Sequence, residues 1–86
     1  MELDPTALHA HCLGATLHAR GDVAGAAELE ARSVKLEPSN ARYRWALIMS
    51  LRKLGRDGEA REQAELILET EPGVAAHRER FARFFP

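Results

Sequence analysis

The sequence lacks several features that would point to particular classes of protein. It contains a single cysteine, Cys12, so no internal disulfide can hold the fold and packing must do so instead. No apolar run approaches the ~20 residues of a membrane helix, and the N-terminus lacks the basic start and apolar stretch of a signal peptide. We therefore expect a cytoplasmic protein with no membrane partner.

An excess of charge is also missing. Twelve basic and thirteen acidic residues leave a formal net charge of -1, which disfavours nucleic acid as a partner. There is no glycine-rich phosphate loop and no G-x-S-x-G motif, so the chain offers neither a nucleotide site nor a serine nucleophile. We expect no enzymatic activity and no cofactor.

The stretch "HAHCLGATLHARG", residues 9–21, is the one concentration of reactive side chains. His11 and His18 share a helix face but stand about 10 Å apart along the axis, too far for one ion. His9 and Cys12 could reach a common metal, yet no further pair of ligands completes a zinc site. Cys12 lies mid-helix, away from the N-terminus that would activate it, and is interpreted as a small apolar filler. A metal or redox site is the less favoured alternative.

Packing residues, in contrast, recur through the chain. Residues 7–40 align without a gap on residues 41–74, and self-similarity at a fixed period is the mark of a repeat architecture. The apolar spacing within each unit is helical, and nothing alternates with period two. The matched pairs are Ala7/Ala41, Leu13/Leu47, Leu17/Leu51, Gly21/Gly55, Ala26/Ala60, Glu28/Glu62, Glu37/Glu71 and Pro38/Pro72.

Helix-breaking residues divide each unit into two helices. Gly21 can end one helix in the left-handed conformation, Asp22 can cap the next, and Pro38 closes it. Gly55, Asp57 and Pro72 repeat this order in the second unit. The sequence therefore predicts helical hairpins over residues 6–20 with 22–37 and 40–54 with 57–71.

These units resemble the tetratricopeptide repeat, a 34-residue helical hairpin. Its characteristic positions hold, in order, a leucine, a small residue, an apolar residue, an alanine and a proline. Those positions, or slots, hold Leu13, Gly14, Leu17, Ala26 and Pro38, then Leu47, Ile48, Leu51, Ala60 and Pro72. Departures at Ala10, Arg44, Ile48, Glu30 and Ala64 should alter packing locally. The resemblance implies one all-α domain, residues 1–86, built as a right-handed α-solenoid of five helices.

That domain comprises repeat one at 7–40, repeat two at 41–74 and a capping helix at 74–85. The last segment keeps the register, with Phe81, Ala82 and Phe85 on the packing slots, and it must cover the second hairpin. Phe84 either packs under the chain end or marks an apolar patch. At the other end, "MELDPT" is similar to the close of a preceding unit, as in a slice of a longer array.

By resemblance, the first helix of each hairpin lines a concave groove that binds partners. Trp45 and Met49 lie one turn apart on this side, and tryptophan is common in binding hot spots. We expect Trp45 to be exposed there; the alternative is that it fills the core. The expected partner-binding residues are Leu8, His11, Ala15, His18, Arg42, Trp45, Met49, Arg52 and Arg83.

Charge separates by helix in a way that bears on the partner. Ten of the thirteen acids, Glu30 among them, lie in the second helices and their caps, whereas eight of the twelve bases lie on first-type helices. This pattern predicts a basic inner face and an acidic outer face, or else simple pairing of charges between adjacent helices.

The sequence thus predicts a non-catalytic protein-interaction module, an adaptor or scaffold that binds a peptide or protein segment with acidic flanks and an apolar anchor. The alternative is a structural segment that forms a homodimer through its terminal helix, using Phe84 and Phe85.

Overall fold

The computed structural model describes residues 5–86 as five α-helices. They are α1 (Pro5–Ala19), α2 (Val23–Leu36), α3 (Ala41–Lys53), α4 (Asp57–Thr70) and α5 (Ala75–Phe84). No strand occurs in this part of the chain, so the predicted all-α class is confirmed and each helix falls within a few residues of its predicted range. The proposed remnant of a preceding unit, "MELDPT", falls mostly outside the described residues.

Local chemistry explains where the helices begin and end. Gly21 and Gly55 adopt φ of 90° and 79°, the left-handed conformation expected of them. Asp22 caps α2 as predicted, because its Oδ1 accepts a hydrogen bond from the Gly25 backbone N–H at 2.9 Å. Asp57 was wrongly predicted as a cap: it is the first residue of α4, where a carboxylate instead favours the positive helix end.

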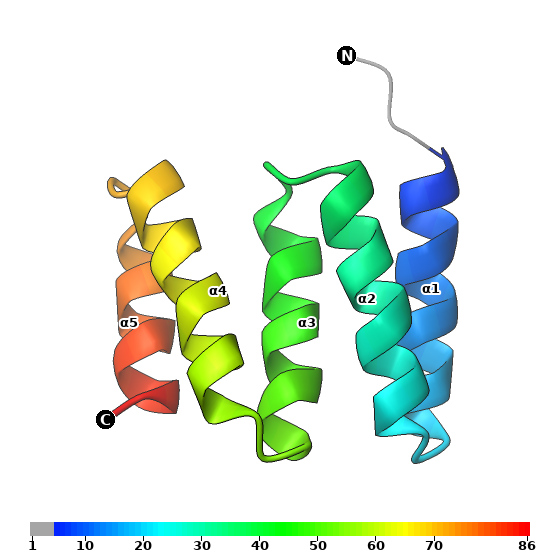
Figure 1. The fold of residues 1–86 in the computed structure, drawn as a ribbon. Helices are drawn as coiled ribbons and strands as arrows, with labels where there is room; N and C mark the ends of the chain where they lie inside the picture. Colours follow the sequence, from blue (N-terminus) through cyan, green and yellow to red (C-terminus); the bar gives the residue numbers. More distant parts are fainter. Residues whose placement is uncertain (1–4) are drawn as a thin grey trace.

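The helices follow one another across the molecule in chain order (Figure 1). Consecutive helices pack together from α1 to α5. In addition, α1 contacts α3, and side chains of α5 contact Trp45 and Arg52 of α3. The result is a flattened body with principal extents of 35, 28 and 16 Å. None of the helices formed by residues 5–86 is long and apolar enough to cross a membrane.

The core is centred on α3. This helix contributes five buried apolar side chains, whereas α5 contributes none and only packs its rings against the core from outside. Small residues let α2 and α4 approach their neighbours: Ala26 and Ala60, equivalent in the repeat, are both completely buried. The larger core members are Val34, Tyr43, Trp45, Leu47, Ile48, Leu51 and Ile67.

Leu13 and Leu54 are substantially exposed, and Leu13 lies on a predicted packing slot. Leu13 is 44% exposed, although its equivalent Leu47 is only 6% exposed. The reason is that α3 lies between α2 and α4, while no helix of residues 5–86 covers the outer side of α1. Leu54 is 36% exposed because α3 ends at Lys53, which leaves this leucine at the helix cap.

Candidate binding face

A cleft lies between α1 and α3, on the side predicted to bind a partner. It encloses about 280 Å³ and is lined by His11, Ala15, His18, Glu30, Ala46, Met49 and Ser50. The alanines keep the space open, since a larger side chain at either position would fill it, and Met49 is 43% exposed at its edge. The walls are therefore mostly apolar, which is typical of sites that accept a side chain or small ligand.

A buried carboxylate forms part of this cleft. Glu30 reaches it from α2 and is 2% exposed, with its Oε2 2.9 Å from Nδ1 of His11. An ionised carboxylate only accepts hydrogen bonds, so His11 donates through Nδ1 in that state. The His11 ring also packs against Tyr43, with ring centroids 4.8 Å apart. The imidazole is thus held from two sides.

Gly14 is what makes room for this carboxylate. A Cβ atom built on Gly14 would lie 2.6 Å from Oε1 of Glu30, closer than real Cβ contacts. The small-residue slot of the first repeat therefore holds a carboxylate where the second repeat holds apolar side chains. The placement of Glu30 on an acidic outer face was wrong, because the gap at Gly14 lets its side chain turn inward.

Burial controls the ionisation of Glu30. Removal from water raises the pKa of its carboxyl above the ordinary value, because the charged form loses solvation. The hydrogen bond from His11 and the positive charge that His11 and His18 can carry act in the opposite direction but are weaker. The cleft consequently contains a carboxylate that lacks full compensation for its lost water.

A second hollow of about 440 Å³ adjoins the cleft through His11. Leu8, Asn40, Arg42 and Tyr43 complete its lining. Asn40 shapes this region by capping α3: its Oδ1 accepts from the backbone N–H of Arg42 at 3.0 Å and of Tyr43 at 3.3 Å. We use "the α1–α3 face" for the predicted residues that these two hollows bring together, namely Leu8, His11, Ala15, His18, Arg42 and Met49.

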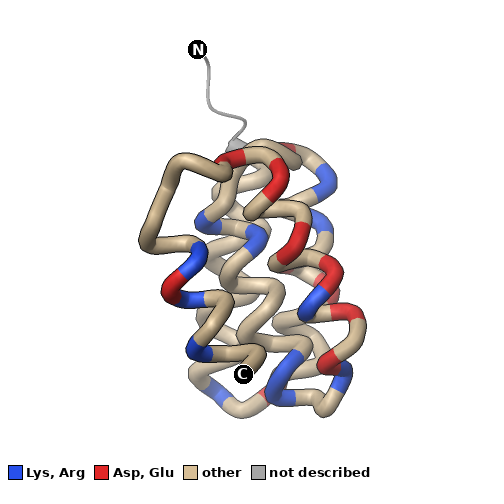
Figure 2. The backbone as a smooth tube through the Cα atoms, turned by 90° about the vertical axis from the view of Figure 1, so that its left-hand side faces the viewer, with Lys and Arg blue, Asp and Glu red and all other residues tan. Residues whose placement is uncertain are grey.

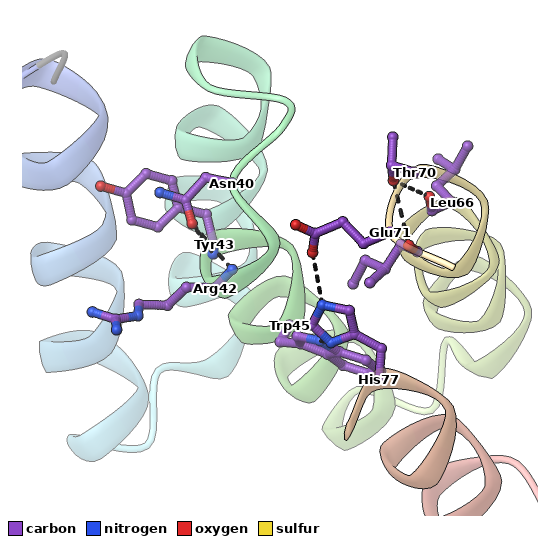
Figure 3. Close-up of polar contacts among 9 residues, drawn as sticks. Asn40, Arg42, Tyr43, Trp45, Leu66, Thr70, Glu71 and His77 are labelled. Carbon is purple, nitrogen blue, oxygen red and sulfur yellow. Dashed lines mark hydrogen bonds and ion pairs between the residues drawn. The ribbon is translucent and has the colours of Figure 1, made fainter. Parts of the chain in front are cut away.

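Trp45 does not belong to this face, and its predicted exposure was wrong. It is 5% exposed because α5 covers it (Figure 3). Its Nε1–H donates to Nδ1 of His77 at 3.1 Å, and Nε2 of His77 lies 2.7 Å from Oε1 of Glu71. Phe84 meets the indole edge-on, with centroids 6.0 Å apart. The alternative interpretation, a core tryptophan, is the one the structure supports.

The remaining two predicted residues lie elsewhere. Arg52 stacks over the ring of Phe84, with its guanidinium carbon 4.5 Å from the centroid, and Arg83 is exposed in the last turn of α5. Phe84 therefore packs under the chain end, and both it and Phe85 are only partly exposed. This reduces the apolar surface that a homodimer through α5 could use.

The opposite side of the molecule carries a different hollow. A groove of about 560 Å³ runs between α2 and α4, and Leu47 and Leu51 of α3 contribute to its lining. Its rim carries Glu28, Glu59 and Glu62, although Glu59 already pairs with Arg56 at 2.5 Å. In Figure 2 most acidic positions lie along one side with basic positions among them, and α5 at the other side carries mainly basic positions. We call the groove between α2 and α4 the outer groove.

The reactive residues of α1 do not gather into a metal-binding cluster within residues 5–86. Among the residues described, no group of three or more His, Cys, Asp or Glu side chains could hold a metal ion. Cys12, interpreted as an apolar filler, is exposed because it lies on the uncovered side of α1. Among the histidines of α1, His11 has a defined hydrogen-bond partner, Glu30.

Comparison with family models, with curated proteins and with solved structures finds no match for this chain.

Proposed function

We propose that this chain is a protein-interaction module of two tetratricopeptide-like hairpins and a capping helix, and that it binds a peptide segment on the α1–α3 face. The repeat register in the sequence and the packing of each helix on its chain neighbours support the architecture. The cleft between α1 and α3 is the observation that carries the binding site.

The location of the cleft supports a binding role over a packing defect. It lies where the periodic register puts partner-facing residues, and its mouth carries an exposed methionine, a side chain that adapts to varied partners. Arg42 in the adjoining hollow is exposed and can pair with an acidic residue of the bound segment. A short segment could thus occupy both hollows at once.

Filling the cleft tests this proposal. Short random peptides displayed on phage are selected against the immobilised protein, and the enriched sequences are then titrated into wild type and Ala15→Leu. We expect the larger side chain to weaken binding at least tenfold, about 1.4 kcal/mol. Ala31→Leu adds the same bulk at an exposed position of the outer groove and should bind like wild type.

Two results would contradict the proposal. One is the absence of any enriched peptide; the other is equal binding by wild type and Ala15→Leu, with loss in Ala31→Leu, which would move the site to the outer groove. Circular dichroism of both variants shows whether they remain helical, so that a folding defect is not mistaken for lost binding.

Self-association through α5 has less support. The rings that would form the contact already pack on Trp45 and Arg52 of the same chain. We expect the molar mass measured by light scattering to stay that of a monomer across a concentration series, and a rising mass would favour this alternative.

A further inference from the structure

The carboxylate of Glu30 lines the cleft on the α1–α3 face and has one oxygen that accepts no hydrogen bond from His11. Oε2 of Glu30 accepts from His11, but no residue from 5 to 86 donates a hydrogen bond to Oε1. The residue as a whole is 2% exposed, but within residues 5–86 no buried side-chain oxygen lacks a partner, so Oε1 is the oxygen that keeps contact with solvent. An occupant of the cleft that displaced water from this oxygen without donating a hydrogen bond would leave it unsatisfied, which is energetically costly.

From this we infer that the cleft binds the side chain of a lysine, with its aliphatic stem between the alanines and its ammonium group at Glu30. The inference rests on the proposed function, since it specifies the anchor residue of the bound segment. It also changes the expected chemistry of that anchor from purely apolar to cationic.

Side chains of different chemistry would have different effects on Glu30 when they enter the cleft. Any occupant excludes the remaining water from Glu30. A purely apolar side chain would leave Oε1 still without a donor, and burying a polar group without a hydrogen bond is unfavourable. An acidic side chain would add a second negative charge in a poorly solvated space, which disfavours ionisation of both groups.

A lysine side chain satisfies both parts of the site. Its flexible four-carbon stem can lie along the apolar walls formed by Ala15, Ala46 and Met49, while its ammonium group donates to the carboxylate. Charge-assisted hydrogen bonds of this kind are stronger than neutral ones. The basic residues that suggested an acidic partner do not oppose this, because Arg42, Arg52 and Arg83 do not line the cleft.

The raised pKa of Glu30 agrees with this inference. Burial disfavours the charged carboxylate, and the hydrogen bond from His11 compensates only in part. A bound ammonium group would supply the missing stabilisation of the charged form.

Three matched small molecules test the inference without any peptide partner. N-acetyl-lysine methylamide, N-acetyl-norleucine methylamide and N-acetyl-glutamate methylamide are titrated separately, and the NMR signals of the Ala15, Ala46 and Met49 methyl groups report occupancy of the cleft. We expect the lysine compound to bind at least tenfold more tightly than norleucine, which has a similar shape but no charge. The glutamate compound should cause no saturating shift.

Glu30→Gln is the decisive variant, because it keeps the size of the side chain and an oxygen that can accept from His11. The preference for lysine over norleucine should fall below threefold in this variant. Ala15→Leu, which fills the cleft, should abolish the shifts caused by every compound.

Equal binding of lysine and norleucine to wild type would overturn the inference, as would a lysine preference that survives in Glu30→Gln. The absence of a saturating shift with lysine would overturn it too. The inference and the proposed function can fail separately: peptides selected without an enriched lysine refute only the former, and lysine binding without any selected peptide refutes only the latter.

Discussion

The two helical hairpins occupy equivalent positions in the repeat, yet they are packed differently. In the second hairpin Leu47 is 6% exposed, while its counterpart Leu13 in the first hairpin is 44% exposed. The residue type is the same, and the difference comes from the neighbours: α3 is covered by α2 and α4, and α1 is covered on one side only. Burial of a residue in this fold therefore depends on the neighbours of its helix as much as on its side chain.

The contrast extends to the interior of each hairpin. The first hairpin pairs Gly14 with the buried carboxylate of Glu30, whereas the equivalent positions in the second hold Ile48 and Ala64, both completely buried. The larger side chain of the pair lies on the second helix in the first hairpin and on the first helix in the second hairpin. In the first hairpin that larger side chain is a carboxylate. The polar interior of the first hairpin adjoins the cleft, while the second hairpin is covered by α5, which packs on α4 and on Trp45.

Trp45 and His11 are 34 residues apart, at equivalent positions of the two units. Replacing each with alanine should give the largest difference in the free energy of unfolding. Trp45→Ala removes a large buried side chain and should lower the free energy of unfolding by about 3–5 kcal/mol. His11→Ala removes a partly exposed ring and leaves Glu30 without its donor, which should cost about 1–3 kcal/mol. Urea denaturation of both variants measures the difference; equal losses would contradict the burial of Trp45.

The two leucines that open this comparison give the next test. Leu47→Ala should cost about 2–5 kcal/mol, as for other buried leucines. Leu13→Ala should cost less than about 1 kcal/mol, because nearly half of the side chain is already in water. Thermal or urea unfolding measures both values. A large loss at Leu13 would mean that another surface covers α1 in solution.

Replacing residues 14 and 30 of the first hairpin with their counterparts from the second hairpin should show that these two positions are energetically coupled. Gly14→Ile places bulk against the Glu30 carboxylate and should destabilise the protein by about 1–3 kcal/mol. Adding Glu30→Ala, so that the first hairpin copies Ile48 and Ala64, should recover at least half of that loss. Double-mutant analysis of unfolding free energies gives the coupling, and simple additivity would contradict the proposed contact.

The carboxyl group of Glu30 should also make the stability of the protein depend on pH. We expect this to be the smallest of the four effects. Because the folded-state pKa of Glu30 lies above its ordinary value of 4.5, the folded state holds this proton more tightly than the unfolded state. The stabilising contribution is complete below that value and is lost as pH rises through the folded-state pKa. Glu30→Gln should therefore gain stability relative to wild type over that rise, measured by urea unfolding at several pH values.

A constant difference between the two proteins across this range would show that Glu30 is not perturbed.

Much of the fold could be predicted from the sequence because helix signals are local. The glycines, Asp22 and the apolar spacing act within a few residues of themselves, and the five helices follow from them. Burial could not be read from the same pattern. Leu13 and Leu47 are identical within their units, and only the arrangement of neighbouring helices separates them.

The candidate site was likewise predictable where it depends on local helix geometry, and not where it depends on the packing of distant helices. Six of the nine expected residues meet on the α1–α3 face because helical periodicity fixes which side chains share a side. Trp45 was misplaced because its cover comes from α5, through His77 and Phe84. Glu30 was missed, although the repeat alignment contained a signal: a glutamate stands where the second unit has Ala64, and Gly14 stands where the second unit has Ile48.

The central claim is that the cleft between α1 and α3 is where a partner binds. Chemical-shift mapping with a peptide enriched in the selection tests it most directly, using the methyl signals of Ala15, Ala46 and Met49 against those of Ala24 and Ala31 in the outer groove. We predict saturating shifts in the first set and none in the second. Shifts confined to Ala24 and Ala31 would contradict the account.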